Sequence, residues 1–129
     1  MDYSELIQNA NRHNPFMTHN GMAVTAIGDG TASVAADITE LSCNPYHAAH
    51  GGFLFTLADC ATGCAAHSDG RRHVTLSSSM NFLRMAQSGT VVASASVTKR
   101  GKTVSVVEVS LDCEGQCLAS GSFTYFCLD

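Results

Sequence analysis

The chain has 129 residues, a formal net charge of −4 and 45% hydrophobic residues. This length suits one domain with a proper core, so residues 1–129 are expected to form a single domain. The acidic balance argues against nucleic acid as a partner, and no apolar run is long enough to span a membrane. The N-terminus lacks a basic stretch followed by an apolar one, so no secretory signal is expected and the predicted location is cytoplasmic.

The cysteines do not follow the spacing of a disulfide framework or a metal site. Cys60 and Cys64 lie four residues apart in a helical run, and Cys113 and Cys117 flank a turn-like Glu114-Gly115. Neither pair has the two-residue gap of common zinc or redox motifs. We expect small buried hydrophobic side chains, with reactive or regulatory thiols as the alternative and no bound metal.

The first half of the chain predicts a helix followed by two strands. Residues 2–12 have the apolar spacing of a short amphipathic helix, which Asn14-Pro15 should end, so residues 1–15 are expected to be a helix and a loop. Gly28-Asp29-Gly30 is a hairpin turn signal. The flanking strands and the loop that follows them are predicted at residues 22–27, 31–38 and 39–49.

The second half predicts one long buried helix and four strands. From Gly51 to about Ser68 the run is rich in Leu, Ala and Phe and nearly free of charge, which favours a helix covered on most sides. Period-two alternation predicts strands around residues 74–82, 93–98, 104–111 and 123–127. In the third of these the apolar phase slips, which predicts a bulge or a stretch covered on both faces. Short turns imply antiparallel pairing, and one helix on such a sheet is an α+β domain.

Asp59 is the residue most indicative of chemistry, because it lies in the middle of the uncharged helical run. Asp is a poor helix former, and a buried carboxylate is costly unless it is paired or hydrogen-bonded. At the start of the same helix, Gly51 and Gly52 offer unpaired backbone N–H groups without a Cβ to block a ligand. Such amides stabilise negative charge on a carbonyl oxygen, while an acid acts as nucleophile or general base.

Helix geometry separates these two groups within one chain. At a rise of about 1.5 Å per residue, Asp59 lies roughly 12 Å along the axis from Gly51, which is too far for an Asp side chain to close. Two copies with antiparallel neighbouring helices would place the acid of one opposite the helix start of the other. The reach argument therefore predicts a two-fold dimer with two composite sites.

The pattern of Asn44, His50-Gly51-Gly52 and Asp59 resembles that of the hotdog-fold acyl-CoA thioesterases of the phenylacetate-pathway type. His47 stands where that family usually has Gly. The resemblance runs from about residue 20 to the end and includes TLAD, MNFLRMAQSG and RGKTVSVVEV. It implies a hotdog fold, in which an antiparallel sheet wraps one long central helix, and an enzyme that hydrolyses a thioester to a free acid and coenzyme A.

The resemblance also implies a role for each site residue. Asp59 would be the nucleophile or base, the Gly51 amide would polarise the carbonyl, and Asn44 would position the water or the substrate. His50 would shape the turn, and Ser77 would help to hold the water. In that family the Asp and the Ser come from one subunit and the other residues from its partner, so a homodimer and a further homotetramer are implied. No cofactor is implied, since coenzyme A arrives as part of the substrate.

Basic residues gather in two places and are the predicted binders of the coenzyme A phosphates. They are Arg71 and Arg72 next to the helix end, and Lys99, Arg100 and Lys102 around one turn. Structural alternatives stay open for every site residue: a hydrogen-bonded structural acid at position 59, a turn-forming Asn44, a structural His50, an ordinary strand serine at position 77 and solvated turn charges.

Two other functions are compatible with the fold. A hotdog dehydratase or hydratase would convert a 3-hydroxyacyl ester to an enoyl product without releasing thiol. A non-catalytic acyl-CoA-binding protein would bind thioester without cleaving it. Both rest on analogy of fold rather than on residues of this chain.

Overall fold

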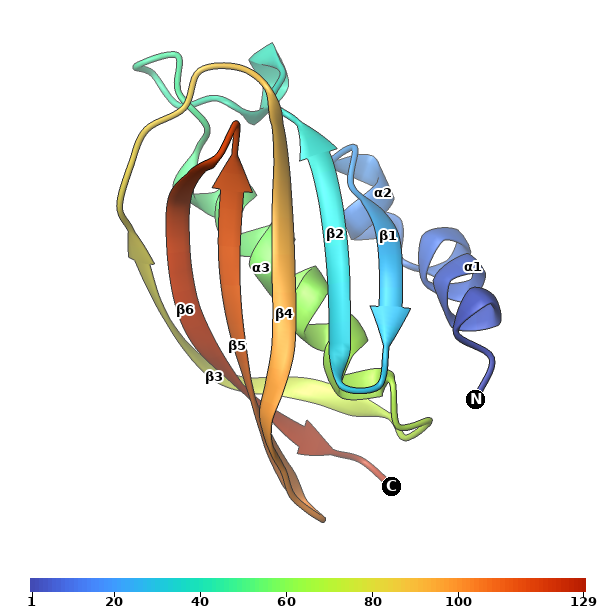
Figure 1. Ribbon diagram of the computed structural model, residues 1–129. Helices are drawn as coiled ribbons and strands as arrows, with labels where there is room; N and C mark the ends of the chain where they lie inside the picture. Colours follow the sequence, from blue (N-terminus) through green and yellow to red (C-terminus); the bar gives the residue numbers. More distant parts are fainter.

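The computed structural model describes all residues 1–129 and contains one six-stranded antiparallel sheet curved around a central helix, α3 (Gly51–His67) (Figure 1). The strand order is β1-β2-β4-β5-β6-β3, so β1 and β3 are the two edges. The strands are β1 (Ala23–Gly28), β2 (Thr31–Asp37), β3 (His73–Phe82), β4 (Thr90–Arg100), β5 (Val104–Cys113) and β6 (Gln116–Cys127). The predicted α+β class and the hotdog arrangement are confirmed.

The N-terminal segment forms two helices rather than a helix and a loop. The expected first helix is present as α1 (Tyr3–His13) and ends at Asn14, as predicted. Pro15, however, begins a second short helix, α2 (Pro15–His19), because proline is well suited to the first helical position, where its missing N–H is not needed. The side chain of Asn14 caps α2 by accepting the Met17 N–H at 3.3 Å.

Helix α1 packs beside the edge strand β1 (Figure 1). The Asn11 amide accepts the Val24 N–H at 2.8 Å and donates to the Val24 carbonyl at 3.1 Å, so one side chain completes the exposed strand edge. None of the helices combines the length and the apolarity that crossing a membrane requires.

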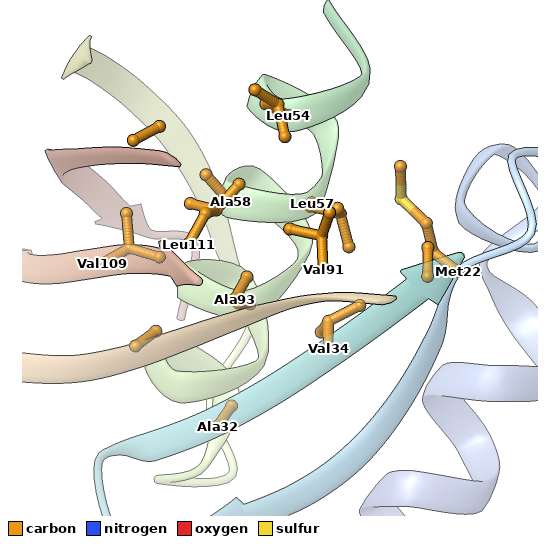
Figure 2. Close-up of a cluster of buried hydrophobic side chains, with 14 of the residues drawn as sticks. Met22, Ala32, Val34, Leu54, Leu57, Ala58, Val91, Ala93, Val109 and Leu111 are labelled. Atoms are coloured by element: carbon orange, nitrogen blue, oxygen red, sulfur yellow. The ribbon is translucent and has the colours of Figure 1, made fainter. Parts of the chain in front are cut away.

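The core lies between α3 and the concave face of the sheet (Figure 2). Ala58, Ala61 and Ala65 are fully buried, and these small side chains let the helix approach the strands closely. Larger buried side chains fill the space on both sides: Leu57 from the helix, and Val34, Val91, Val107, Leu111 and Phe123 from the sheet. The predicted burial of the long helix is confirmed along this face.

The phase slip predicted in β5 has a different origin. In β5 the buried positions alternate without interruption, with Ser105, Val107 and Val109 toward the core. The extra residue belongs to the neighbouring strand, since the β4–β5 register shifts between Val97 and Lys99. The prediction of a bulge is therefore confirmed for this pair of strands, but the extra residue lies in β4 rather than in β5.

Strand β3 also contains an irregularity that the sequence pattern did not predict. Thr75 pairs with Tyr125 and Ser77 with Thr124, so Leu76 is an extra residue. Tyr125 is buried and points toward α3, so its partner Thr75 also lies on the helix side of the sheet. Ser77 pairs with Thr124, whose side chain alternates with that of Tyr125, and so falls on the opposite face.

Candidate active site

Asp59 lies in the middle of α3 and lines a cavity of about 760 Å³. The cavity is bounded by α3, by α1 and α2, and by the strands β3 and β6. Apolar and polar side chains both line it, among them Leu6, Ala10, Phe16, Ile27, Phe55, His67, His73 and Tyr125. The predicted catalytic acid therefore stands in the wall of a hollow large enough for a small organic group.

Two hydroxyl groups hold the Asp59 carboxylate. Thr75 Oγ1 donates to Oδ1 of Asp59 at 2.7 Å. The Tyr125 hydroxyl lies 3.1 Å from the same oxygen and 2.8 Å from the Asp59 carbonyl oxygen. Both partners come from strands that are distant in sequence, and neither was singled out from the sequence. The signal that pointed to Asp59, an acid in an apolar helix, does not reveal which groups satisfy it.

Burial, reinforced by the negative charge of Asp59, raises the pKa of Tyr125 above its ordinary value. The phenol therefore stays protonated and able to donate throughout the neutral range. Burial and the nearby charges of Asp59 and Cys64 raise the pKa of Cys60 to about 12. Burial also raises the pKa of Cys64 to about 11. Both thiols remain protonated and are poor nucleophiles.

The cysteines only partly match their expected role as buried hydrophobic side chains. All six are free. Cys113 and Cys127 are buried, Cys117 is exposed, and the others are half-buried. Packing therefore explains two of them fully.

The start of α3 is built around His50 and two glycines. His50 is the N-cap residue, and its Nδ1 accepts the Gly52 N–H at 2.8 Å. A Cβ on Gly52 would lie 3.1 Å from that nitrogen, so the glycine makes room for the imidazole. The Gly52 amide is thus bonded within the chain rather than unpaired as expected, and its assignment as a substrate-binding residue stays a prediction. Gly51, the first helical residue, has no intrahelical acceptor for its N–H.

Asn44 forms the turn that leads to this helix. Its Oδ1 accepts the N–H groups of Tyr46 at 2.9 Å and Ala48 at 3.2 Å. Inside the turn, His47 has a φ of 61°, in the left-handed region that favours glycine. This conformation gives a physical reason for the glycine that related proteins usually carry here. Oδ1 of Asn44 therefore stabilises the turn, as in the structural role considered for this residue. Its Nδ2 group makes no hydrogen bond within the chain.

Within one chain the structure does not bring the acid and the helix start together. Gly51 and Asn44 line a second cavity, of about 410 Å³, together with Leu54, Phe82, Leu83 and Met85. Asp59 lines only the larger one. Ser77 is exposed on β3 and makes no hydrogen bond to Asp59, a contact that Thr75 makes instead.

Two of the five predicted phosphate-binding residues are gathered around Asp69, just beyond α3. Arg71 pairs with Asp69 at 2.8 Å and donates to the backbone of the turn after β4. Arg100 lies 3.3 Å from the same carboxylate and donates to the Ala66 carbonyl at the end of α3. Burial disfavours ionisation of Asp69, but hydrogen bonds from Arg71 and His73 outweigh it and lower its pKa to about 2.

The remaining residues predicted to bind phosphate differ in whether an acidic side chain of the chain already pairs with them. Arg72 pairs with Asp129 at 2.7 Å near the C-terminus. Lys99 and Lys102 are exposed and form no ion pair. The three arginines therefore have structural partners, and the two lysines are the free cations of the group.

Comparison with known proteins identifies the family. The sequence model of the Thioesterase superfamily matches residues 46–119. The acyl-coenzyme A thioesterase PaaI of Escherichia coli is 33% identical over 92 residues, which cover 70% of this chain and 66% of that protein, slightly less than two thirds of its length. A putative esterase of Deinococcus radiodurans is 33% identical over 102 residues, 77% of this chain and 69% of the relative.

Solved structures agree. The PaaI protein from the E. coli phenylacetic acid degradation operon superposes with a TM-score of 0.92 at 25% identity, covering 98% of this chain and 96% of that one. The smu.793 protein of Streptococcus mutans, solved bound to acetyl-CoA, gives a TM-score of 0.79 at 31% identity, covering 82% and 87%.

The fold is thus that of the hotdog thioesterases. The chain belongs to the Thioesterase superfamily, and its predicted PaaI-like membership is confirmed.

Proposed function

We propose that the protein hydrolyses an acyl-CoA thioester to a free acid and coenzyme A, in a site that a second copy of the chain completes. One observation carries the proposal: Gly51, whose amide is proposed to activate the carbonyl, and Asp59, the proposed catalytic acid, line separate cavities in a single chain. The names of the relatives support the substrate class, since one is an acyl-coenzyme A thioesterase and another was solved with acetyl-CoA.

The edge strand β3 supports the dimer. It is 10 residues long, lies at the edge of the sheet and exposes apolar side chains, with Val74 45%, Leu76 59% and Phe82 52% exposed. A long apolar edge of this kind is a template for pairing with another strand. Two copies joined antiparallel along β3 would bury these side chains and form a continuous sheet.

The same strand links the two halves of the proposed site. At one end Thr75 contacts Asp59. At the other end Phe82 lies beside Gly51, since a Cβ on this glycine would be 3.8 Å from Phe82 Cζ. A two-fold axis between these ends brings the Thr75 end of one β3 toward the Phe82 end of the other. Asp59 of one copy then faces Gly51 of the second.

The chemistry follows from the two groups. The Gly51 N–H, at the positive end of the α3 dipole, holds the thioester oxygen as negative charge develops on it. Along one route, the Asp59 carboxylate attacks the carbonyl carbon, the C–S bond breaks, and the thiolate leaves and takes a proton; water then cleaves the anhydride. Along the other, Asp59 removes a proton from the water that attacks. Both routes give an acid and a thiol without a metal or organic cofactor.

The other residues have supporting roles in this proposal. His50 fixes the helix start, the free Nδ2 of Asn44 points a donor toward substrate or water, and Ser77 meets the water only once the partner is in place. Lys99 and Lys102 are the cations available to the coenzyme A phosphates. Pairing of two dimers into a tetramer remains a prediction.

The first test is release of thiol from a panel of aromatic, aliphatic and hydroxylated acyl-CoAs, followed with a thiol-detecting reagent. Thiol release supports hydrolysis. Conversion of a 3-hydroxyacyl-CoA to an enoyl product without thiol would indicate a dehydratase instead, and saturable binding without either product would indicate a binding protein.

The shared site has its own test, in which two inactive variants are unfolded together and refolded as a mixture. In a mixed dimer of Asp59→Asn and Gly51→Pro, one site carries both changes and the other carries neither. Random assortment makes about half of the dimers mixed, so about a quarter of wild-type turnover should return. A mixture that stays inactive, while native mass spectrometry shows mixed dimers, would place both groups in one chain's site.

A further inference from the structure

The two oxygens of the Asp59 carboxylate are in different surroundings. Oδ1 accepts from Thr75 at 2.7 Å and lies 3.1 Å from the Tyr125 hydroxyl. Oδ2 receives no hydrogen bond from any group of the chain, although Asp59 lines the larger cavity. A carboxylate torsion is broad and roughly two-fold when nothing holds it. Here Thr75 donates to Oδ1, and the single Tyr125 proton is shared between Oδ1 and the Asp59 carbonyl oxygen, so one side of the carboxylate is held and the other oxygen is uncommitted.

Several features of the fold serve this arrangement. The extra residue Leu76 changes the phase of β3, which lets Thr75 face the helix together with the later inward residues of the strand. Gly63 lies one turn beyond Asp59, and a Cβ there would be 3.3 Å from the Tyr125 hydroxyl oxygen. Thr62 lies 2.8 Å from the same hydroxyl and holds it from the other side. The phenol is therefore held in a fitted position in the wall of the cavity.

We propose that Thr75 and Tyr125 are positioning residues that turn Oδ2 of Asp59 toward the substrate, so that Oδ2 is the oxygen that reacts. This inference rests on the proposed function. Oδ1 is kept against the sheet by the two hydroxyls. Near-attack geometry at the carbonyl carbon, or at a water in front of it, depends on this orientation. The two residues act through Asp59 and need no contact with the substrate.

The test compares Tyr125→Phe and Thr75→Val, each of which removes one hydroxyl with little change of shape. We expect kcat to fall about tenfold or more in each, with KM little changed, because a hydrogen bond to a charged group is lost. The acid limb of the kcat/KM profile should also move, because each variant loses a hydroxyl group that contacts the reacting carboxylate. Thr75→Ser, which keeps the hydroxyl, should restore both quantities.

Other titratable groups border the same cavity and do not change between the variants. They are His13 of α1, Cys60, Cys64 and His67 of α3, and His73 of β3. A difference in acid limb between wild type and variant therefore arises from the loss of the hydroxyl group.

Matched controls exist elsewhere in the chain. Thr90 donates to Asp37 through the same kind of threonine–aspartate hydrogen bond, and Thr90→Val should lower stability without moving the acid limb. Tyr3→Phe removes a phenol hydroxyl that makes no hydrogen bond in the chain.

The outcomes separate this inference from the proposed function. In one outcome Asp59→Asn is inactive, but Tyr125→Phe and Thr75→Val keep the wild-type kcat and acid limb and have only a lower Tm. Thr75 and Tyr125 would then be structural, so the positioning role would be wrong while the proposed function stands. If Asp59→Asn keeps its activity, the proposed function fails first. Should Tyr125→Phe not fold, Thr75→Val, at an exposed position, decides the question by itself.

Discussion

The start and the middle of helix α3 are held in opposite ways. Around Gly51, the side-chain hydrogen bonds are local: His50 accepts from Gly52 two residues away, and Asn44 accepts from Tyr46 and Ala48, two and four residues away. Around Asp59, they are distant: Thr75 lies 16 residues along the chain and Tyr125 lies 66. The side-chain hydrogen bonds of one half of the proposed site therefore lie within a short segment, whereas those of the other half form only in the assembled sheet.

This difference suggests how each half should respond to change. A local motif keeps its shape as long as its own residues are intact, so substitutions there alter the chemistry with little effect on the rest of the molecule. The acid depends on strands that must pair correctly before its partners are in place. Substitutions around it therefore couple catalysis to the packing of β3 and β6.

The largest effect is expected from Asp59→Asn. Turnover should fall about a thousandfold or more, because a neutral amide neither attacks a thioester nor takes a proton from water. The fold should persist, since the asparagine oxygen still accepts from Thr75. Steady-state thiol release and a melting curve measure the two quantities. Asp29→Asn in the β1–β2 turn is the matched control, and retention of activity by Asp59→Asn would remove the acid from the mechanism.

The next largest effect is expected from Gly51→Pro at the local half of the site. Proline suits the first position of a helix, and His50 already has the extended conformation preferred before proline, with a ψ of 141°. The change removes the N–H without a strained backbone, so kcat should fall about a hundredfold while Tm is kept. Gly51→Ala keeps the N–H, so the ratio of the two variants isolates the amide. Equal rates would show that this donor is not used.

Asp69→Asn tests the ionic contacts at the end of α3, two of them local and one, to Arg100, distant. Loss of its bonds to Arg71, Arg100 and His73 should lower Tm by about 3–6 °C near neutral pH. The pKa of Asp69 is lowered from 3.8 to about 2, so its contribution is present above pH 4 and is lost as the pH falls toward 2. The difference in Tm between wild type and variant should shrink over that interval. A constant difference would mean that the charge of Asp69 is not what stabilises the fold.

The smallest effect is expected from His47→Gly in the Asn44 turn. Glycine adopts a φ of 61° without strain, so the free energy of unfolding should rise by about 0.5–1 kcal/mol after its greater freedom in the unfolded chain is counted. His19→Gly, at a helical position, should be destabilising instead. Chemical denaturation of both variants measures the contrast, and the same sign in both would argue against strain at position 47.

Much of the fold was predictable because its signals are local. The hairpin at Asp29-Gly30, the helix from Gly51 and the alternation in most strands depend on turn chemistry and on periodicity. The second helix at Pro15 was missed, because Asn14-Pro15 ends one helix and begins another with the same residues. The bulge at Leu76 was missed as well, because alternation in the sequence continues through it.

The sequence by itself determined that an acid stands alone in an apolar helix, about two turns from a capped, glycine-rich start, and helix geometry then predicted that a second copy joins them. Only the tertiary structure decided what the acid touches. Pairing of β3 with β6 carries Thr75 and Tyr125 to one oxygen of Asp59. The folded chain also gives internal acidic partners to the arginines expected to bind phosphate. Such contacts depend on strand register, which is settled by the packing of whole strands rather than by any short run of residues.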